Sequence, residues 1–259
     1  MSDPVLRSYP KWDYPKYQQG ETAALFIPCF IDQFFPSAGK AMVKLLENEG
    51  VPLEFPPEQT CCGQAAFNSG YWDEAKPVME HFYEVFKSYK WIITPSTSCA
   101  AMARVFYEQL APGSDAAKLG QRVFDISEFL VNCLGKTSFS PASAGAGKPK
   151  KVALHIGCHG RRELGIVEQP LTLLQNIPGV EYVPLNYMEE CCGFGGTFSV
   201  KMPGTSIAMG KRKTENILAS GCDVLATLDL SCVMHFGGIM RKDPAAKNIP
   251  LVHLVELLV

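Results

Sequence analysis

The stretch Thr60-Cys61-Cys62-Gly63-Gln64 has a counterpart later in the chain, at Glu190-Cys191-Cys192-Gly193-Phe194. Each Cys-Cys-Gly stretch lies between two further cysteines, and the spacing is nearly the same in both copies. The steps are 32 and 37 residues in the first copy and 33 and 40 residues in the second. Eight of the ten cysteines belong to this pattern: Cys29, Cys61, Cys62, Cys99, Cys158, Cys191, Cys192 and Cys232. Two related halves are indicated, and four converging thiolates in each suit zinc or an iron–sulfur cluster.

Short apolar runs precede the outer cysteines of each set, as buried strands would. They cover residues 23–28, 91–94, 151–156 and 224–227. Helical periodicity covers residues 75–86 and 207–218, and Gly221 follows the second of these helices as a C-terminal signal. Strands that alternate with helices favour parallel sheets. We therefore predict an α/β fold of two pseudo-twofold-related, Rossmann-like βαβ halves, with the cysteine sites at the carboxyl edges of the strands.

Domain boundaries follow from the composition. Residues 138–150 are rich in Ser, Ala, Gly and Pro and are expected to form a linker. The predicted halves are residues 1–137, in which 1–20 form an extended arm, and residues 151–259.

The overall composition limits the classes of function. The chain has 259 residues, 47% of them hydrophobic and 19% charged, as in a protein with a substantial core. A net charge of -2 argues against nucleic acid as a partner. We find no signal peptide in residues 1–20 and no apolar run long enough to span a membrane. A cytoplasmic location is expected, where cysteines serve as metal ligands more often than as disulfides.

The spacing favours an iron–sulfur cluster over structural zinc. The usual zinc signature is a pair of C-x2-C motifs, and the sequence has none. Adjacent cysteine side chains are expected to point apart, which suits a cluster several ångströms across better than one ion. Gly63 and Gly193 remove a Cβ where backbone amides would approach the cluster and donate to its sulfurs. A tight turn before a helix is the alternative role of these glycines.

The chain resembles the cysteine-rich "CCG" domain family in these motifs. That family includes a cysteine-rich component of heterodisulfide reductase, the iron–sulfur component of glycolate oxidase and one component of a succinate dehydrogenase. The strongest likeness is to the lactate-utilisation protein A family. The matching segments are residues 27–32, 60–64, 95–99, 157–164, 191–197 and 231–235.

The resemblance implies an iron–sulfur electron-transfer subunit of a complex that oxidises L-lactate or a related 2-hydroxy acid. It implies one or two [4Fe-4S] clusters, with the eight cysteines as ligands and Gly63 and Gly193 beside them. It also implies a ferredoxin-like iron–sulfur subunit and a third lactate-utilisation protein as partners. A heterodisulfide-reductase-like thiol/disulfide subunit and a zinc-stabilised interaction protein are the alternatives.

The sequence departs from the fullest form of the motif. Each copy in heterodisulfide reductase ends in C-x-x-C, which gives five cysteines. Here Ser96 and Met102 flank Cys99, and Asp229 and His235 flank Cys232. Four thiolates per site favour an ordinary four-iron cluster, although His235, Asp229 or an open iron could complete a modified one.

Polar residues follow Cys158 and mark candidate catalytic groups. His159 could move a proton, and Arg161 and Arg162 could hold a carboxylate through two hydrogen bonds each. A solvated helix start is the alternative for this segment. His235 is a further candidate, whereas His155 is expected to be a buried histidine with satisfied hydrogen bonds.

Four other features have plainer interpretations. Cys133 and Cys222 lie outside the repeat and are expected to pack in the core. The aromatic arm of residues 9–17 is either an interface or folded back on its own domain. Lys211, Arg212 and Lys213 are expected to form a solvated helix face.

Overall fold

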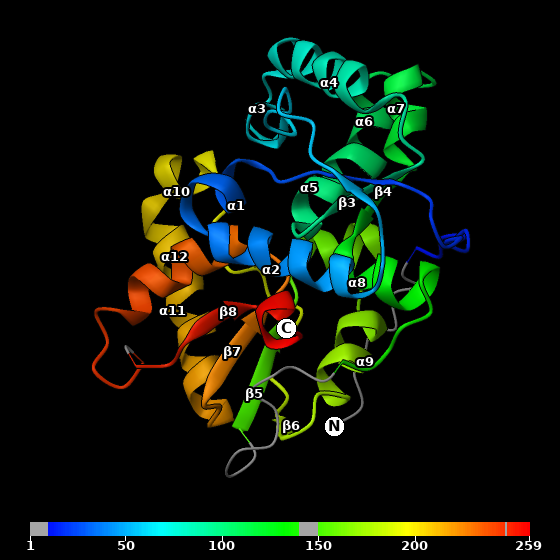
Figure 1. Ribbon diagram of the computed structural model, residues 1–259. Helices are drawn as coiled ribbons and strands as arrows, with labels where there is room; N and C mark the ends of the chain where they lie inside the picture. The colour runs from blue at the N-terminus through cyan, green and yellow to red at the C-terminus, as the bar shows by residue number, and fades with distance from the viewer. Residues whose placement is uncertain (1–9, 140–149, 247) are drawn as a thin grey trace.

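The computed structural model describes residues 10–139, 150–246 and 248–259, and these form two parallel sheets (Figure 1). Each sheet has four strands and the same topology, with orders β2-β1-β3-β4 and β6-β5-β7-β8. The predicted α/β fold of two Rossmann-like halves is therefore confirmed. The strands are β1 (Ala23–Leu25), β2 (Leu53–Glu54), β3 (Trp91–Thr94), β4 (Val123–Asp125), β5 (Lys150–His155), β6 (Val180–Tyr182), β7 (Val224–Thr227) and β8 (Leu251–His253).

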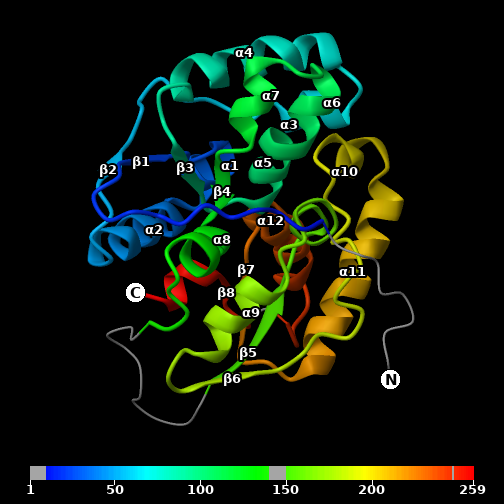
Figure 2. The ribbon, with the colours of Figure 1, turned by 90° about the vertical axis from the view of Figure 1, so that its right-hand side faces the viewer.

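Helices cover both faces of each sheet. In the first half, α4 and α7 lie on one face and α2 and α8 on the other; in the second, α11 and α12 lie opposite α9 (Figures 1 and 2). The first half contains α1 (Cys29–Phe34), α2 (Pro36–Asn48), α3 (Gln64–Asn68), α4 (Trp72–Phe86), α5 (Thr97–Ala101), α6 (Tyr107–Leu110), α7 (Asp115–Gly120) and α8 (Ile126–Glu128). The second contains α9 (Glu168–Gln175), α10 (Thr197–Lys201), α11 (Pro203–Ser220), α12 (Leu230–Met240) and the 3-10 turn η4 (Leu254–Leu257). Single π-helical turns span Met102–Phe106, Phe129–Cys133 and Gly160–Leu164.

Burial explains why these segments form these elements. All four residues of β3 and of β7 are buried, as expected for central strands of a parallel sheet with both faces covered. Helix α4 buries Ala75, Met79, Phe82 and Phe86, which recur at helical spacing on one face. The helix predicted at residues 207–218 is confirmed as α11, and Gly221 ends it in the left-handed conformation.

Two predictions about single residues need comment. Cys133 and Cys222 are buried, in agreement with simple packing. The solvated face predicted for residues 211–213 is wrong at Lys213, which is 1% exposed and donates from Nζ to the Tyr187 carbonyl at 3.1 Å. Lys213 shares the inner face of α11 with Ser206, Gly210 and Ile217.

The N-terminal arm lies along the junction of the two halves (Figure 2). Trp12 Nε1 donates to the carbonyl of Leu164 in the second half at 2.9 Å, while Tyr14 Oη donates to Glu128 in the first at 2.7 Å. Of the two interpretations offered by the sequence, this part of the arm supports the one in which it folds back. Residues 1–9 lie outside the described ranges. Residues 140–149 of the predicted linker lie outside them as well. Lys150, the last residue of the predicted linker, is instead the first residue of β5.

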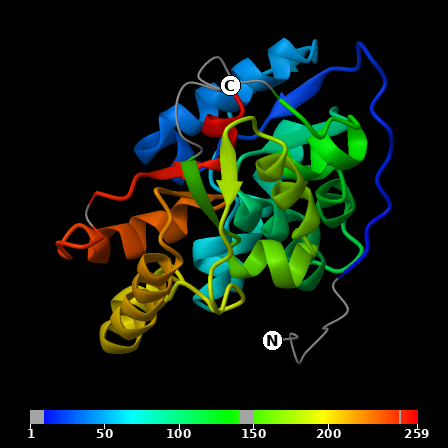
Figure 3. The same ribbon diagram turned by 90° about the horizontal axis from the view of Figure 1, so that it is seen from below.

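The chain's C-terminal turn also ties the halves together, since η4 packs on α2 of the first half (Figure 3). In the ranges that the structure describes, no helix combines the length and apolar character that crossing a membrane requires.

Candidate metal centre

All eight cysteines of the repeat line a single cavity of about 140 Å³ between the two halves. The sequence predicts the carboxyl-edge position of each set but not that the two edges face one another. Each outer cysteine directly follows a strand: Cys29 begins α1 and Cys158 follows β5, while Cys99 and Cys232 lie in the first turns of α5 and α12. The two predicted cysteine sites therefore face the same cavity from its two sides.

The sulfurs of each set lie within a few ångströms of one another. In the first set, Cys29 and Cys61 Sγ atoms are 4.0 Å apart, and those of Cys62 and Cys99 are 3.4 Å apart. In the second set, Cys192 and Cys232 Sγ atoms are 3.0 Å apart. All ten cysteines are free thiols in the structure. The members of each predicted ligand set therefore lie together at one side of the cavity.

Ionisation is unequal within each set. The thiols of Cys29 and Cys62 hydrogen-bond to Cys61, and the pKa of Cys61 falls to about 2. Hydrogen bonding to that thiolate, together with burial, raises the pKa of Cys29 and of Cys62. The second set repeats the arrangement, with the pKa of Cys191 lowered to about 2 by hydrogen bonds from its neighbouring thiols. Four thiolates at such distances repel one another, so each full set can ionise only around a cation.

The neighbouring cysteines of the first pair contact different partners. Cys61 lies against Cys29, and Cys62 lies against Cys99. The sequence argument that such a pair suits a cluster better than a single ion stays a prediction. Backbone amides complete the turns: the N–H groups of Gly63 and Gly193 each donate to a cysteine sulfur at 3.4 Å.

The two glycines of the Cys-Cys-Gly turns differ in the space around them. Both have positive φ, at 85° and 88°. A Cβ on Gly63 would lie 3.5 Å from Val78, its nearest neighbour, whereas one on Gly193 would lie 2.7 Å from both the Ser206 carbonyl oxygen and Met209 Cβ. A side chain at Gly193 thus meets backbone as well as an unfavourable φ.

We expect Gly193→Ala to destabilise the metal-free protein more than Gly63→Ala. The left-handed conformation costs about 1–2 kcal/mol at either position. The clash at Gly193 should add about 1–3 kcal/mol, the usual cost of overpacking. Urea unfolding of both variants measures the difference. Equal losses of stability would show that the backbone at Ser206 moves away and relieves the clash.

His159 connects the two halves beside the cavity that it lines. Its Nδ1 lies 2.9 Å from Nε2 of Gln64, the residue after Gly63. The same Gln64 amide donates to the Ser98 carbonyl at 3.0 Å, which identifies it as the NH₂ group. Nδ1 of His159 is therefore the acceptor, and the neutral ring carries its proton on Nε2.

Asp229 is a second link between the halves, and the sequence considers it only as a possible ligand. Its Oδ2 accepts from the Ser98 N–H at 3.0 Å, and its Oδ1 accepts from the Ser231 N–H at 3.2 Å. One buried carboxylate thus caps the helices that carry Cys99 and Cys232. Sequence spacing gives no sign of this contact, since Asp229 and Ser98 are 131 residues apart.

The two candidate arginines lie away from the described cavity lining. Arg161 is buried and contacts Met188 Sδ at 3.4 Å through Nη2. Arg162 donates from Nη2 to the Glu189 carbonyl at 3.2 Å, and its charge helps to lower the pKa of Cys191. Both side chains hold the loop before the second Cys-Cys-Gly turn.

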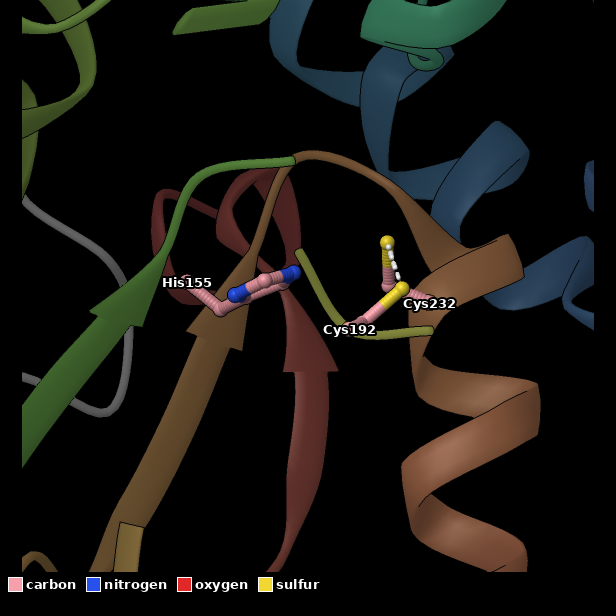
Figure 4. Close-up of side chains that lie close together, drawn as sticks. All are labelled: His155, Cys192 and Cys232. Carbon is pink, nitrogen blue, oxygen red and sulfur yellow. Dashed lines mark hydrogen bonds between the residues drawn. The ribbon is translucent and has the colours of Figure 1, made fainter. Parts of the chain in front are cut away.

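His235 and His155 both lie in the second half, and neither is among the residues described as lining the cavity. His235 Nε2 lies 3.0 Å from the Ser206 carbonyl oxygen, so this histidine braces α11 against α12 outside the described cavity lining. His155 is buried as predicted, but neither ring nitrogen has a hydrogen-bond partner within the described part of the chain, so the prediction that its hydrogen bonds are satisfied is wrong. Instead, its ring nitrogens approach the sulfurs of Cys192 and Cys232 (Figure 4).

Comparison with known proteins agrees with this geometry. The cysteine-rich domain family "CCG" matches residues 23–104 and 152–237, one match in each half. A solved structure of a hypothetical protein from Helicobacter pylori superposes with a TM-score of 0.55 at 12% identity, over 95% of this chain and 50% of that protein. At that identity the likeness shows a shared fold and nothing more.

Two relatives match almost the whole chain. Lactate utilization protein A 2 of Bacillus cereus (strain AH820) is 40% identical over 240 residues, 91% of this chain and 96% of that protein. Lactate utilization protein A of an Exiguobacterium species is 42% identical over 241 residues with the same coverage. With a cysteine-rich domain in each half and relatives of this similarity, the chain belongs to the lactate utilization protein A family.

Proposed function

We propose that this chain is the iron–sulfur electron-transfer subunit of a complex that oxidises L-lactate. The names of its relatives support the role in lactate utilisation. The observation that carries the electron-transfer role is the single cavity lined by two four-cysteine sets. Two redox centres so close together can exchange electrons directly, which is what a relay requires.

The cavity fits iron–sulfur clusters better than bare ions. Its volume of about 140 Å³ far exceeds the ~10–15 Å³ that one water requires. Cys29, Cys61, Cys62 and Cys99 would hold one cluster, and Cys158, Cys191, Cys192 and Cys232 the other. When bound, such clusters supply reversible one-electron chemistry at a potential set partly by hydrogen bonds to sulfur. The amides of Gly63, Gly193 and Phe194 are placed to make such bonds, since each already donates to a cysteine sulfur.

His159 is the residue best placed to assist a molecule in the cavity. Gln64 fixes the ring orientation and leaves the Nε2 proton free to be donated. A hydroxy acid that entered the cavity would present oxygens to this N–H. The contacts described for Arg161 and Arg162 are with the neighbouring loop, and carboxylate binding by either arginine stays a prediction.

An exposed apolar surface beside the cavity supports a protein partner. Tyr71 and Trp72 of the first half and Val200 and Met202 of the second are more than half exposed. The two groups adjoin, because Lys201 Nζ lies 5.7 Å from the Tyr71 ring centroid. In the sequence, both groups come several residues after a Cys-Cys-Gly turn. We therefore propose that the ferredoxin-like iron–sulfur subunit binds to this surface. A third lactate-utilisation protein would complete the complex.

Protein purified without oxygen should contain iron and acid-labile sulfide. The matched control replaces Cys61, Cys62, Cys191 and Cys192 by Ala and should bind neither, because half of the thiolates in each set are lost. Elemental analysis and a sulfide assay on both proteins make the test. Stoichiometric zinc without iron in the unaltered protein would refute the electron-transfer role and favour a zinc-stabilised interaction protein.

A further inference from the structure

His155 is a buried polar residue in the core of the second half, and its two ring nitrogens lack hydrogen-bond partners among the described residues. The residue ends β5 and is 1% exposed. A ring contact with Phe236, at 5.3 Å between centroids, is apolar packing and satisfies neither nitrogen. A buried polar group without a hydrogen-bond partner destabilises the folded protein, so such a group calls for a partner.

Two sulfurs of the second cysteine set lie beside the His155 ring. A ring nitrogen of His155 and the sulfurs of Cys192 and Cys232 all lie within 4.8 Å of one another. Figure 4 shows the imidazole extending from β5 toward the two sulfurs. A neutral imidazole has a lone pair on one ring nitrogen, which is the form in which histidine binds a metal.

The first half shows that the position does not need histidine for packing. Phe26 lies three residues before Cys29, as His155 lies three residues before Cys158. Phe26 is fully buried and packs edge-to-face on Phe82 and Phe86. An apolar ring therefore suffices at this place in the fold, and the histidine of the second half has another purpose.

Lys213 indicates that the second set holds a negatively charged group. Its ammonium is buried, and its hydrogen bond is to a neutral carbonyl of Tyr187. Burial lowers the pKa of Lys213, while Glu190, Cys192 and Cys232 favour its charged form. Glu190 also forms an ion pair with Arg212 at 2.7 Å. A buried ammonium needs a compensating charge, and a thiolate-bound centre at these cysteines would supply it.

We propose that His155 is a nitrogen ligand of the metal centre at the second cysteine set. The first centre then has sulfur ligands alone, and the second has mixed sulfur and nitrogen ligation. Bond lengths of about 2.3 Å to sulfur and 2.1 Å to nitrogen, at a tetrahedral angle, place the two ligand atoms about 3.6 Å apart. Because the ring nitrogen lies within 4.8 Å of the sulfurs, a movement of the ring by about 1 Å completes the contact. The inference rests on the proposed function, since it takes a metal centre at these cysteines as given.

Pulsed EPR on reduced, anaerobically reconstituted protein tests the assignment directly. Protein labelled with ¹⁵N-histidine should show a nitrogen coupling to one of its two centres, and His155→Phe should lose it. His81→Gln is the matched control, because His81 is an exposed histidine on α4 that contacts the Glu58 carbonyl. Iron release to a chelator should be at least about tenfold faster in His155→Phe, the lower end of what disturbed ligation costs.

The outcomes separate this inference from the proposed function. A nitrogen coupling that persists in His155→Phe, or its absence from unaltered protein with both centres loaded, overturns the ligand assignment. Protein that binds no iron contradicts the proposed function instead. His155→Phe should fold, because it reproduces the Phe26 arrangement of the first half. His155→Gln gives a second variant if it does not, and unfolding of the metal-free proteins checks both.

Discussion

Cys191→Ala should abolish lactate-dependent dye reduction by the assembled complex, and Cys61→Ala should do the same. Each residue carries the most acidic thiol of its set, with a pKa of about 2, and accepts a hydrogen bond from the amide of the nearby glycine. Its loss removes both a proposed ligand and the group to which the neighbouring thiols hydrogen-bond, so the proposed cluster should be weakened or lost. Cells that carry either variant should fail to grow on lactate and still grow on glucose, if no other lactate dehydrogenase is present.

Cys133→Ala and Cys222→Ala are the matched controls for these substitutions. Both cysteines are buried, and neither belongs to the cavity lining described here. Each control should keep its iron and its activity. Wild-type activity in Cys191→Ala, with loss of iron from the second set confirmed, would exclude that centre from the electron path. Cys61→Ala examined in the same way tests the first centre separately.

The shared cavity bears on the different roles that the sequence suggests for the two cysteine sets. Polar residues crowd the second set in the sequence, which predicts substrate- or partner-facing chemistry there and relay chemistry in the first half. In the structure, His159 hydrogen-bonds to Gln64 and Asp229 to Ser98, so the same polar groups stand beside both sets. Any molecule in the cavity would be within reach of both walls.

Local patterns were sufficient to predict the halves, because strand and helix signals are carried by neighbouring residues. The buried runs at β3 and β7 and the periodicity of α4 each lie within one short segment. The docking of the halves depends on pairs far apart in the chain, such as Gln64 and His159 at 95 residues. One sequence contains no signal for such a pair, and so the single cavity could not be foreseen.

Lys213 and His155 show a second limit on what the sequence alone predicts, which concerns the surroundings of single polar side chains. The charge run at residues 211–213 suggests solvent, yet Ser206, Gly210, Lys213 and Ile217 recur at helical spacing on the buried face of α11. That spacing is readable in the sequence and would have placed Lys213 inside. The strand pattern predicts a buried His155, as found, but only the packing around β5 shows that its ring has no hydrogen-bond partner among the described residues.

Glu128→Gln should lower the free energy of unfolding by about 3–5 kcal/mol, the usual cost of breaking a buried ion pair. Glu128 is fully buried and pairs with Arg104 through two hydrogen bonds of 2.9 Å, one to each carboxylate oxygen. Its Oε2 also accepts from the Asp125 N–H at 3.1 Å. Glutamine keeps the shape of the side chain but removes the charge that compensates the guanidinium.

The surface ion pair between Lys118 and Asp115 provides the control. Both side chains are more than two-thirds exposed, so Lys118→Gln should change stability by less than about 0.5 kcal/mol. Urea unfolding of the metal-free variants measures both effects. Equal changes for the two would mean that water reaches Arg104 when the pair is broken.

The same substitution of Glu128 should loosen the N-terminal arm, because Glu128 also holds Tyr14. Tyr14 Oη donates to Glu128 Oε1 at 2.7 Å, and the guanidinium of Arg104 lies 5.0 Å from the ring centroid of Trp12. Tyr14→Phe removes only the hydrogen bond to the carboxylate and should cost about 1–3 kcal/mol, less than Glu128→Gln. Proteolysis near residues 10–17 should accelerate in Glu128→Gln. An arm that stays protected while global stability falls would show that Trp12 and its bond to Leu164 are sufficient to hold it.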